Sequence, residues 1–294
     1  MTNLATPTEN DNNLLSKPDF QIVQRKYTQE NSYANMTNVH FHDFYEVYYL
    51  FSGKRRYLIN ADFFEINAGD LVLVKKNDLH MTKEVPNTFG ENIKLYLTKS
   101  FINNLGESSS QFIECFNHTH IVLPEKHKKF PNDIFNKIIN ETKRNDEYSI
   151  QLIRNHIYDL LSFIYRIVTV DNYNKELISA NKQVNDAMRY IYTNFNKDLT
   201  LKEIAESVHL NASYFSRLFK DVIGISLTQF INRIRIKEAS SMLRNTYLNI
   251  TEIALHCGFD DPKYFCRVFK SITGYSAKEF RNNENLQIQW NVYN

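Results

Sequence analysis

The apolar positions between residues 199 and 281 recur at a helical period, and the same arrangement occurs twice. In each copy a short apolar stripe is followed by a break of a few residues and then by a second stripe. The stripes of the first copy consist of Leu201, Ile204, Ala205 and Val208, and then of Phe215, Leu218, Phe219 and Val222. Two short helices joined by such a turn form a helix-turn-helix unit, so the pattern predicts two of these units.

Residues shared at constant offsets support the repeat. The Ile-Ala pairs at 204–205 and 253–254 lie 49 residues apart, and the Tyr-Phe-x-Arg-x-Phe-Lys runs at 214–220 and 264–270 lie 50 apart. A long apolar stripe between the units predicts one rigid helix from 227 to 243, which would set their separation. Capping residues mark the helix ends in both copies. They are Thr200 with Glu203, Asn249 with Glu252, and the terminal glycines Gly224 and Gly274.

From Phe20 to about Leu123 the pattern changes to short apolar runs separated by turn residues. Such spacing is typical of a β-sandwich or a small barrel. The chain is therefore predicted to be α+β, with an N-terminal β-barrel and an all-α C-terminal domain. Strands are expected at residues 44–51, 56–59, 63–66, 71–74, 80–85 and 93–98.

A helical period returns after Pro131, with helices expected at about 132–144 and 147–170. The second helix would carry an a/d seam, which favours a homodimer built on these helices. The alternative is a helix packed against the barrel of its own chain, because Leu161 and Val168 widen the apolar face. The seam consists of Ile150, Ile153, Ile157, Leu160, Ile164 and Ile167.

The composition is that of a globular protein of 294 residues, with 43% apolar and 23% charged residues, long enough for two domains. The net charge of +2 is unevenly spread, because the stretch from Lys182 onward carries 15 Lys and Arg against 11 Asp and Glu. A basic C-terminal half agrees with a nucleic-acid partner. The three cysteines lack metal-type spacing, residues 1–17 lack a signal-peptide core, and no apolar run is long enough to span a bilayer. We therefore expect a cytoplasmic protein without a membrane partner.

Four polar residues of the predicted barrel form a candidate metal-ligand set. His40 and His42 alternate on one strand face, and Glu46 and the distant His80 complete a group that suits a divalent metal. The same residues also serve as hydrogen-bonding groups in pockets that hold no metal. We expect no metal, no cofactor and no catalytic residue, and we keep the metal site as the alternative.

The run from His40 to Gly53, the turn Ala68-Gly69-Asp70 and His80 resemble the cupin-type sensor domain of AraC/XylS-family regulators. Sensor domains of that family mostly bind a small effector, so the resemblance implies an effector in this barrel. Aromatic rings in the barrel suit a sugar or another flat-faced ligand. The residues expected at the effector are His40, His42, Tyr45, Glu46, Tyr48 and His80.

Residues 182–281 resemble the DNA-binding domain of the same family. Its most specific residues occur in the second unit as Ile253-Ala254, Gly258-Phe259, Tyr264-Phe265, Arg267, Phe269-Lys270, Gly274 and Phe280-Arg281. Ala277 departs from the family pattern, which usually has proline there, but alanine also suits the first turn of a helix.

In a helix-turn-helix unit the second helix enters the major groove with its outward residues. Arg217 and Arg267 hold the same repeat position, where arginine either reads guanine or contacts a phosphate or a neighbouring acidic residue. The residues expected at DNA are Asn211, Ser213, Tyr214, Ser216, Arg217 and Lys220 in the first unit and Lys263, Tyr264, Cys266, Arg267 and Lys270 in the second.

The chain is expected to contain six segments. They are a flexible leader (1–19), a cupin-like effector-binding domain (20–130), a helical dimerisation element (131–171), a linker (172–181), an AraC-type DNA-binding domain (182–282) and a C-terminal tail (283–294).

The expected function is that of a dimeric transcription regulator that binds double-stranded DNA and a small-molecule effector. RNA polymerase is a further candidate partner. Activator is the working description, and the choice between activation and repression stays open. Two alternatives stay open. One is a cupin-type metal-dependent enzyme fused to a DNA-binding domain, and the other is a regulator without an effector. The paired helix-turn-helix units favour regulation, because an enzyme has no need of them.

Overall fold

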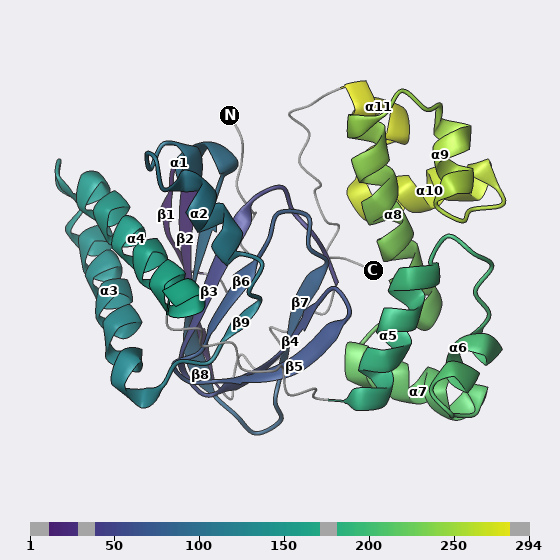
Figure 1. Ribbon diagram of the computed structural model, residues 1–294, viewed down its shortest axis with the longest axis horizontal. Helices are drawn as coiled ribbons and strands as arrows, with labels where there is room; N and C mark the ends of the chain where they lie inside the picture. Colours follow the sequence, from purple (N-terminus) through teal and green to yellow (C-terminus); the bar gives the residue numbers. More distant parts are fainter. Residues whose placement is uncertain (1–11, 29–38, 171–180, 283–294) are drawn as a thin grey trace.

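The computed structural model describes residues 12–28, 39–170 and 181–282, which form a β-rich N-terminal domain and a helical C-terminal domain (Figure 1). This arrangement confirms the α+β class, with a barrel of two sheets followed by two helix-turn-helix units. The expected tail, most of the expected linker and residues 1–11 of the expected leader lie outside the described residues.

Two antiparallel sheets face each other in the N-terminal domain. The larger sheet has the strand order β1-β2-β8-β3-β6-β9, and the smaller one has the order β5-β4-β7. The six strands expected between residues 44 and 98 are confirmed, each to within three residues at either end. The strand bounds are β1 (Asn12–Ser16), β2 (Phe20–Tyr27), β3 (Tyr45–Ser52), β4 (Lys54–Ile59), β5 (Asp62–Asn67), β6 (Leu71–Val74), β7 (His80–Glu84), β8 (Gly90–Leu97) and β9 (His120–Ile121).

Alternate residues of these strands point into the space between the sheets. Tyr48 of β3, Tyr57 of β4 and Phe64 of β5 pack together there, each at most 1% exposed. The ring centroids of Tyr48 and Tyr57 lie 5.2 Å apart in an edge-to-face arrangement, which aromatic pairs prefer. The aromatic residues that predicted strands therefore also fill the middle of the barrel.

Helices cover the outer face of the larger sheet (Figure 1). Their apolar residues form one core with the outward residues of β3, among them Tyr45, Val47 and Tyr49. The N-terminal domain thus has three layers, which are the helices, the larger sheet and the smaller sheet. The helices are α1 (Lys99–Asn103), α2 (Ser109–Cys115), α3 (Glu125–Arg144) and α4 (Ser149–Tyr165), and a π-helical segment (Arg166–Val170) extends α4.

The apolar seam of α4 lies inside this core. Ile157, Leu160 and Ile164 are each at most 1% exposed in the single chain and pack with α3 and the sheet. The expectation that this seam forms a dimer contact is therefore wrong, and the alternative of a helix packed on its own barrel is confirmed. The cause is the width of the apolar face, because Leu161 and Val168 join the same core.

Two boundaries of the N-terminal domain differ from those expected. Strand β1 lies in the segment expected to be a flexible leader. This segment is a regular strand because it pairs with β2 at the edge of the larger sheet. Helix α3 begins at Glu125 and contains Pro131, where the sequence suggested a start after the proline. Interior proline costs about 3 kcal/mol or more, and the burial of Pro131 and of apolar residues further along α3 offsets that cost. Since α3 and α4 share the apolar core of the N-terminal domain, this domain continues past residue 130.

Helices α1 and α2 lie in a region that the sequence suggested was entirely β. They span five and seven residues, which is shorter than the window in which a helical period can be recognised.

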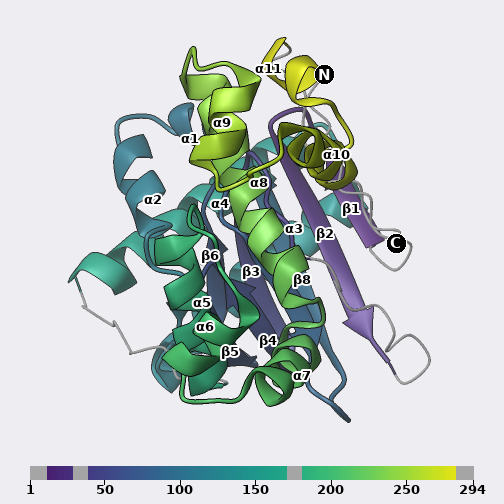
Figure 2. The same ribbon diagram turned by 90° about the vertical axis from the view of Figure 1, so that its right-hand side faces the viewer.

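The C-terminal domain consists of helices in the predicted order. Capping boxes at Thr200 and Asn249 begin the first helix of each unit, as expected. The long helix α8 joins the units, and the second helices α7 and α10 lie toward its two ends (Figure 2). The bounds are α5 (Lys182–Asn194), α6 (Leu201–Ser207), α7 (Ala212–Ile223), α8 (Leu227–Asn245), α9 (Ile250–His256), α10 (Pro262–Thr273) and α11 (Ala277–Asn282).

The predicted helix ends are also confirmed. Gly224 and Gly274 end α7 and α10 in the left-handed conformation, which glycine adopts without strain. Ala277 is the first residue of α11, and Ser276 and Glu279 hydrogen-bond across that helix start. The departure from the family pattern at Ala277 therefore leaves the helix start intact.

Candidate functional site

Helices α7 and α10 expose the same pattern of side chains. Phe215 and Phe219 of α7, like Phe265 and Phe269 of α10, are fully buried. All eleven residues expected at DNA are exposed, so they are available to a partner on one side of each helix. They are Asn211, Ser213, Tyr214, Ser216, Arg217, Lys220, Lys263, Tyr264, Cys266, Arg267 and Lys270.

The starts of these two helices are fixed by short polar side chains. Asn211 accepts a hydrogen bond from the N–H of Tyr214, and Asp261 accepts one from the N–H of Lys263. Pro262 occupies the first turn of α10, where its missing N–H costs nothing. The side-chain oxygen of Asn211 already accepts its capping bond, whereas its amide nitrogen has no hydrogen-bond partner among the described residues and can donate to a partner.

Within the described part of the chain, Arg217 and Arg267 have only weak contacts, along their own helices. Arg217 Nε lies 3.4 Å from the carbonyl of Ser213, and the Arg267 guanidinium lies 5.8 Å from the ring centroid of Tyr264. Tyr264 is itself positioned by α8, because its hydroxyl accepts a 3.0 Å hydrogen bond from Asn232. Both guanidinium groups thus remain available for groups outside the chain.

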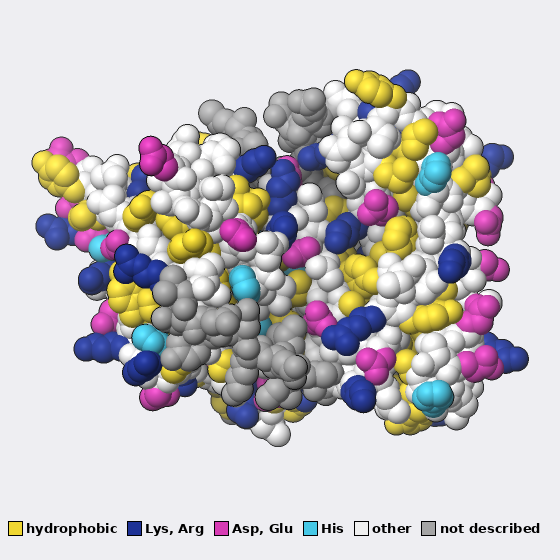
Figure 3. All heavy atoms as spheres, in the orientation of Figure 1, with side chains coloured by type: hydrophobic (Ala, Val, Ile, Leu, Met, Phe, Trp, Pro, Cys, Tyr) yellow, Lys and Arg dark blue, Asp and Glu magenta, His cyan; other side chains and the backbone are white. Residues whose placement is uncertain are grey.

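The face drawn in Figure 3 mixes basic and acidic side chains over both domains. A single strongly basic stripe does not dominate this face, which agrees with the modest net charge of +2. Binding to a polyanion would then depend on individual side chains such as Arg217, Lys220, Arg267 and Lys270 more than on a long-range field.

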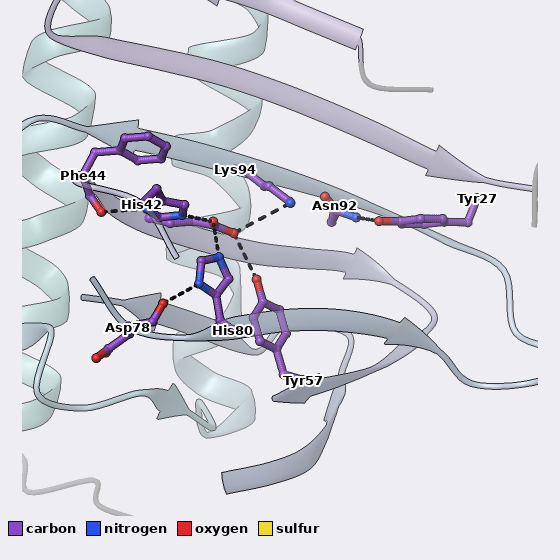
Figure 4. Close-up of polar contacts among 9 residues, drawn as sticks. Tyr27, His42, Phe44, Tyr57, Asp78, His80, Asn92 and Lys94 are labelled. Atoms are coloured by element: carbon purple, nitrogen blue, oxygen red, sulfur yellow. Dashed lines mark hydrogen bonds and ion pairs between the residues drawn. The ribbon is translucent and has the colours of Figure 1, made fainter. Parts of the chain in front are cut away.

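The histidines predicted to form a cluster, His40, His42 and His80, lie close together. Figure 4 shows two of them, His42 and His80, side by side. His40 pairs with His80 in an isolated β-bridge, and their ring centroids lie 4.2 Å apart. His42 Nδ1 contacts the carbonyl of Phe44 at 3.0 Å, and His80 Nδ1 contacts the carbonyl of Asp78 at 2.9 Å. If each Nδ1 donates to its carbonyl, the Nε2 atoms of both rings face Glu46.

Glu46 is the buried centre of this group. Its Oε2 lies 3.3 Å from His42 Nε2 and 3.4 Å from His80 Nε2, while its Oε1 accepts a 3.0 Å hydrogen bond from Tyr57. Burial alone would raise the pKa of Glu46, but the charge of Lys94 and the contacts with both histidines hold that pKa well below its usual value. Burial lowers the pKa of His42 to about 4, against the hydrogen bond with Glu46 that raises it.

The donor set fits a metal in type but only partly in geometry. The ligand atoms of His40, His42 and His80 lie within 4.8 Å of one another. Tetrahedral ligands with bonds of about 2.0–2.1 Å lie about 3.3 Å apart, which matches the two contacts to Glu46 better than the histidine trio. Lys94 Nζ lies 3.8 Å from Glu46 Oε1 and places a fixed positive charge beside the same carboxylate, which opposes a second cation.

One of the residues expected at the effector lies on the wrong face of its strand. Tyr45 packs against the helices, with its ring centroid 4.7 Å from that of Phe116. Glu46 and Tyr48 point the other way, into the barrel, because neighbouring residues of a strand alternate. The placement of Tyr45 at the effector is therefore wrong, while His40, His42, Glu46, Tyr48 and His80 stay candidates.

Sequence reasoning missed a contact surface between the two domains. Asn185 of α5 is only 4% exposed and bonds to both backbone groups of Phe63 in β5, at 3.2 Å each. Arg189, one turn later, forms a 2.8 Å ion pair with Asp62. Apolar residues of the barrel, including Phe41, share one core with the first helix-turn-helix unit.

Helix α8 binds the loop that carries the histidines. Arg233 donates to the carbonyl of Val39 at 2.8 Å, and Arg244 approaches Asp43 at 3.4 Å. His40 and His42 lie between these two anchor points in the sequence. The available signal in the sequence was the row of basic residues on one side of α8, Arg233, Arg235 and Lys237.

The smaller sheet also contacts helix α7. Lys83 of β7 donates to the carbonyls of Asp221 and Val222 in the last turn of α7, the second of them at 3.2 Å. A lysine at a helix C-terminus satisfies unpaired carbonyls and complements the helix dipole. The barrel thus touches the same helix that presents Arg217.

Comparison with known proteins assigns both halves of the chain. Residues 25–112 match the family model described as an AraC-like ligand binding domain, and residues 204–283 match a helix-turn-helix domain. None of the described helices is long and apolar enough to cross a membrane.

Curated relatives are similar to this chain over most of their length. The lactose operon transcription activator of Staphylococcus xylosus is 24% identical over 238 residues, covering 78% of this chain and 80% of that protein. The transcriptional activator RhaS of Enterobacter sp. is 21% identical over 253 residues, covering 85% of this chain and 89% of that protein.

Among solved structures, the C-terminal domain of AraT, a response regulator from Geobacillus stearothermophilus, is 36% identical over 35% of this chain and 85% of that one, with a TM-score of 0.34. The assignment depends on the two family models, their order along the chain and the curated relatives. The chain is a transcription regulator of the AraC family, with an AraC-like ligand-binding domain followed by a helix-turn-helix DNA-binding domain.

Proposed function

We propose that the barrel of this regulator binds a small-molecule effector and transmits its presence to the DNA-binding helices by direct contact. The observation that carries this proposal is the position of the histidine loop. Val39 and Asp43 bind α8 through Arg233 and Arg244, and the loop between them carries two of the candidate effector residues.

An effector that moves His42 or Glu46 displaces the loop held by α8, and α8 joins the two helix-turn-helix units. A ligand shifts such an equilibrium only as far as its affinities for the two arrangements differ. A loop that contacts both the ligand and α8 provides that difference.

We also propose that α7 and α10 read successive major grooves on one face of DNA. Their exposed residues support this, and recognition helices about 34 Å apart meet grooves one helical turn apart. Ser213 and Ser216 of α7 stand where Lys263 and Cys266 stand on α10. The two units therefore prefer different bases, and the site for one chain is asymmetric.

A homodimer remains part of the proposal, with a different interface from the α4 seam. Large apolar side chains are exposed on α3 and on or beside the outward face of α4, which favours burial against a second copy. They are Phe130 (41% exposed), Tyr148 (65%), Leu152 (37%) and Tyr158 (39%). Contact with RNA polymerase and a cytoplasmic location are further proposals, supported by the names of the relatives as transcription activators.

The histidine cluster favours a second candidate function, a cupin-type metal-dependent enzyme fused to the DNA-binding domain. We propose that the chain is not an enzyme, because the curated relatives are transcription regulators and Lys94 already neutralises Glu46. Metal content decides between the two. One tightly held metal per purified chain, lost on His42→Ala but kept on His120→Ala, would support the enzyme.

Fluorescence anisotropy with the full chain tests the regulator. A duplex selected by the protein and a scrambled duplex of the same length are compared at the same salt concentration. We expect the selected duplex to bind roughly 10³-fold more tightly or better. Equal affinities would contradict sequence-specific regulation.

A further inference from the structure

The interior of the barrel is rich in buried basic groups. Arg25 of β2, Arg55 of β4 and Lys94 of β8 are 2%, 3% and 2% exposed. The strand registers place Arg25 opposite Asn92 and Lys94 opposite Tyr48, on the face that looks into the barrel. Buried cations are rare in proteins unless anionic groups surround them.

Lys94 and Arg55 each lie within 4 Å of a carboxylate, but the contact of Arg55 is long. Lys94 Nζ lies 3.8 Å from Glu46 Oε1, at ion-pair distance. Arg55 Nη1 lies 3.6 Å from Glu84 Oε1, which is too long for a hydrogen bond, and its guanidinium lies 4.1 Å from the ring centroid of Tyr27. The Arg55 side chain therefore has a charge neighbour but no close acceptor in that contact.

Two donors on one edge of Arg55 have no partner. Its Nε and Nη2 are buried and lack a hydrogen bond among the described residues. These two N–H groups form the planar fork that matches two oxygens of a carboxylate or phosphate. Unpaired buried donors are costly, and each such group in a folded protein calls for an explanation.

Hydroxyl groups with the same property occur on the neighbouring strands. The hydroxyls of Tyr48 and Thr82 are buried without a hydrogen-bond partner among the described residues. Arg55 lies opposite Glu84, and Tyr57 lies opposite Thr82, so Thr82 is one step along the same inward face from Arg55. Tyr48 packs on Tyr57, with ring centroids 5.2 Å apart, and Tyr57 lies on the same face of β4 as Arg55. The unpaired donors therefore lie on the inward faces of three strands.

We infer that the barrel binds a small oxyanion, a carboxylate or a phosphate, through the Nε–Nη2 edge of Arg55 with the hydroxyls of Tyr48 and Thr82. This inference rests on the proposed function, because it names the chemical class of the effector. An oxyanion supplies acceptors to all of these donors and adds negative charge to a basic interior. A neutral sugar supplies hydroxyls but leaves the charge of Arg55 as it is.

The thermal midpoint of the full chain is measured with inorganic phosphate, acetate, gluconate and glucose 6-phosphate, and with glucose and lactose as neutral probes. Sodium chloride keeps the ionic strength constant, so that screening does not differ between samples. We expect phosphate or a carboxylate to raise the midpoint in a saturable way, because a ligand that binds only the folded state stabilises it. Phosphate and acetate separate the two oxyanion classes.

Variants of neighbouring residues then locate the site. Arg55→Gln is expected to abolish the shift, whereas Arg56→Gln on the opposite face of the same strand keeps it, since Arg56 lies near Glu65 at the surface. Should Arg55→Gln fail to fold, Tyr48→Phe removes only a hydroxyl and is expected to weaken binding about three- to tenfold.

Three results would overturn the inference. They are a shift in midpoint that survives both Arg55→Gln and Tyr48→Phe, a larger shift with glucose or lactose, and no shift with any oxyanion. The wild-type chain's preference for selected DNA is measured in parallel, so that failure of this inference is distinguished from failure of the proposed regulator.

Discussion

Asn185 of α5 pairs with Phe63 of β5 as a neighbouring strand would. Its Oδ1 accepts from the Phe63 N–H, and its Nδ2 donates to the Phe63 carbonyl, at 3.2 Å each. Strand β5 is the edge of the smaller sheet, so this side-chain amide satisfies edge groups that would otherwise be left unpaired. The pairing fastens the barrel to the first helix-turn-helix unit.

Replacing this amide should loosen the domain contact. Asn185→Ala leaves two buried backbone groups of Phe63 without partners, so we expect it to destabilise the contact by about 1–3 kcal/mol for each unsatisfied group. Scanning calorimetry should show a lower midpoint, with the single transition separating into two. Asn194→Ala at the end of the same helix is the control, because the described hydrogen-bond partners of its side chain all belong to the C-terminal domain. They are Tyr190, Thr193 and Lys197. Equal effects of both variants would show that the domains are not coupled through Asn185.

Cysteine reactivity should report which helix faces DNA. Burial raises the pKa of Cys115 and of Cys257 to about 12, so both thiols are protonated near pH 7.5 and are expected to resist N-ethylmaleimide. Cys266 is exposed on α10 and should be the alkylated residue. Selected DNA should slow that alkylation at least several-fold, as measured by mass spectrometry. Alkylation of Cys266 at the same rate with and without DNA would place the DNA elsewhere.

Replacing Gly258 should destabilise the DNA-binding domain more than replacing Gly224. Gly258 has a φ of +82°, and a Cβ added there would lie 2.9 Å from the carbonyl oxygen of Phe195. Gly224 has a similar φ of +92° but nothing within 4 Å of the added Cβ. Alanine at a left-handed position costs about 1–2 kcal/mol, and the clash at Gly258 should add about 1 kcal/mol or more. Urea unfolding followed by circular dichroism gives the unfolding midpoints of Gly258→Ala and Gly224→Ala. Equal midpoints would mean that the backbone at Phe195 moves aside to accommodate the added Cβ.

The oligomeric state should depend on the outer face of α4 and not on its seam. Leu152→Glu with Tyr158→Glu places charge on exposed positions, so we expect light scattering to show the monomer mass with the fold retained. Ile157→Glu instead buries an unpaired charge in the sensor core and should unfold that domain, which circular dichroism detects. A wild-type mass in the folded double variant would exclude this interface.

The helical repeat was readable from the sequence because it depends on local spacing. Phe215, Phe219 and their counterparts Phe265 and Phe269 fix which residues face outward, and capping residues fix where each helix begins. Side chains alternate along β3, which places Glu46 and Tyr48 on one face and Tyr45 on the other. This alternation is enough to exclude Tyr45 from the inward face. These features require only neighbouring residues in the chain.

The domain contact was not readable because it joins distant segments. Asn185 and Phe63 are 122 positions apart, and Lys83 and Asp221 are 138 apart. Nothing in the local pattern of either segment specifies the other. The prediction that the α4 seam forms a dimer contact failed for a related reason. An a/d seam has the same spacing whether it packs against a second chain or against the outer face of a sheet.

Selection from random DNA by the wild-type chain, followed by sequencing, tests most directly whether two unequal helices read the DNA. We expect an enriched asymmetric motif with two elements about 10 base pairs apart, one for each major groove. Arg217→Ala should erase one element and Arg267→Ala the other, each weakening binding by about 1–3 kcal/mol, while Arg144→Ala on the sensor leaves both intact. No enriched motif, or loss of the same element in both arginine variants, would contradict the assignment of α7 and α10 as separate readers.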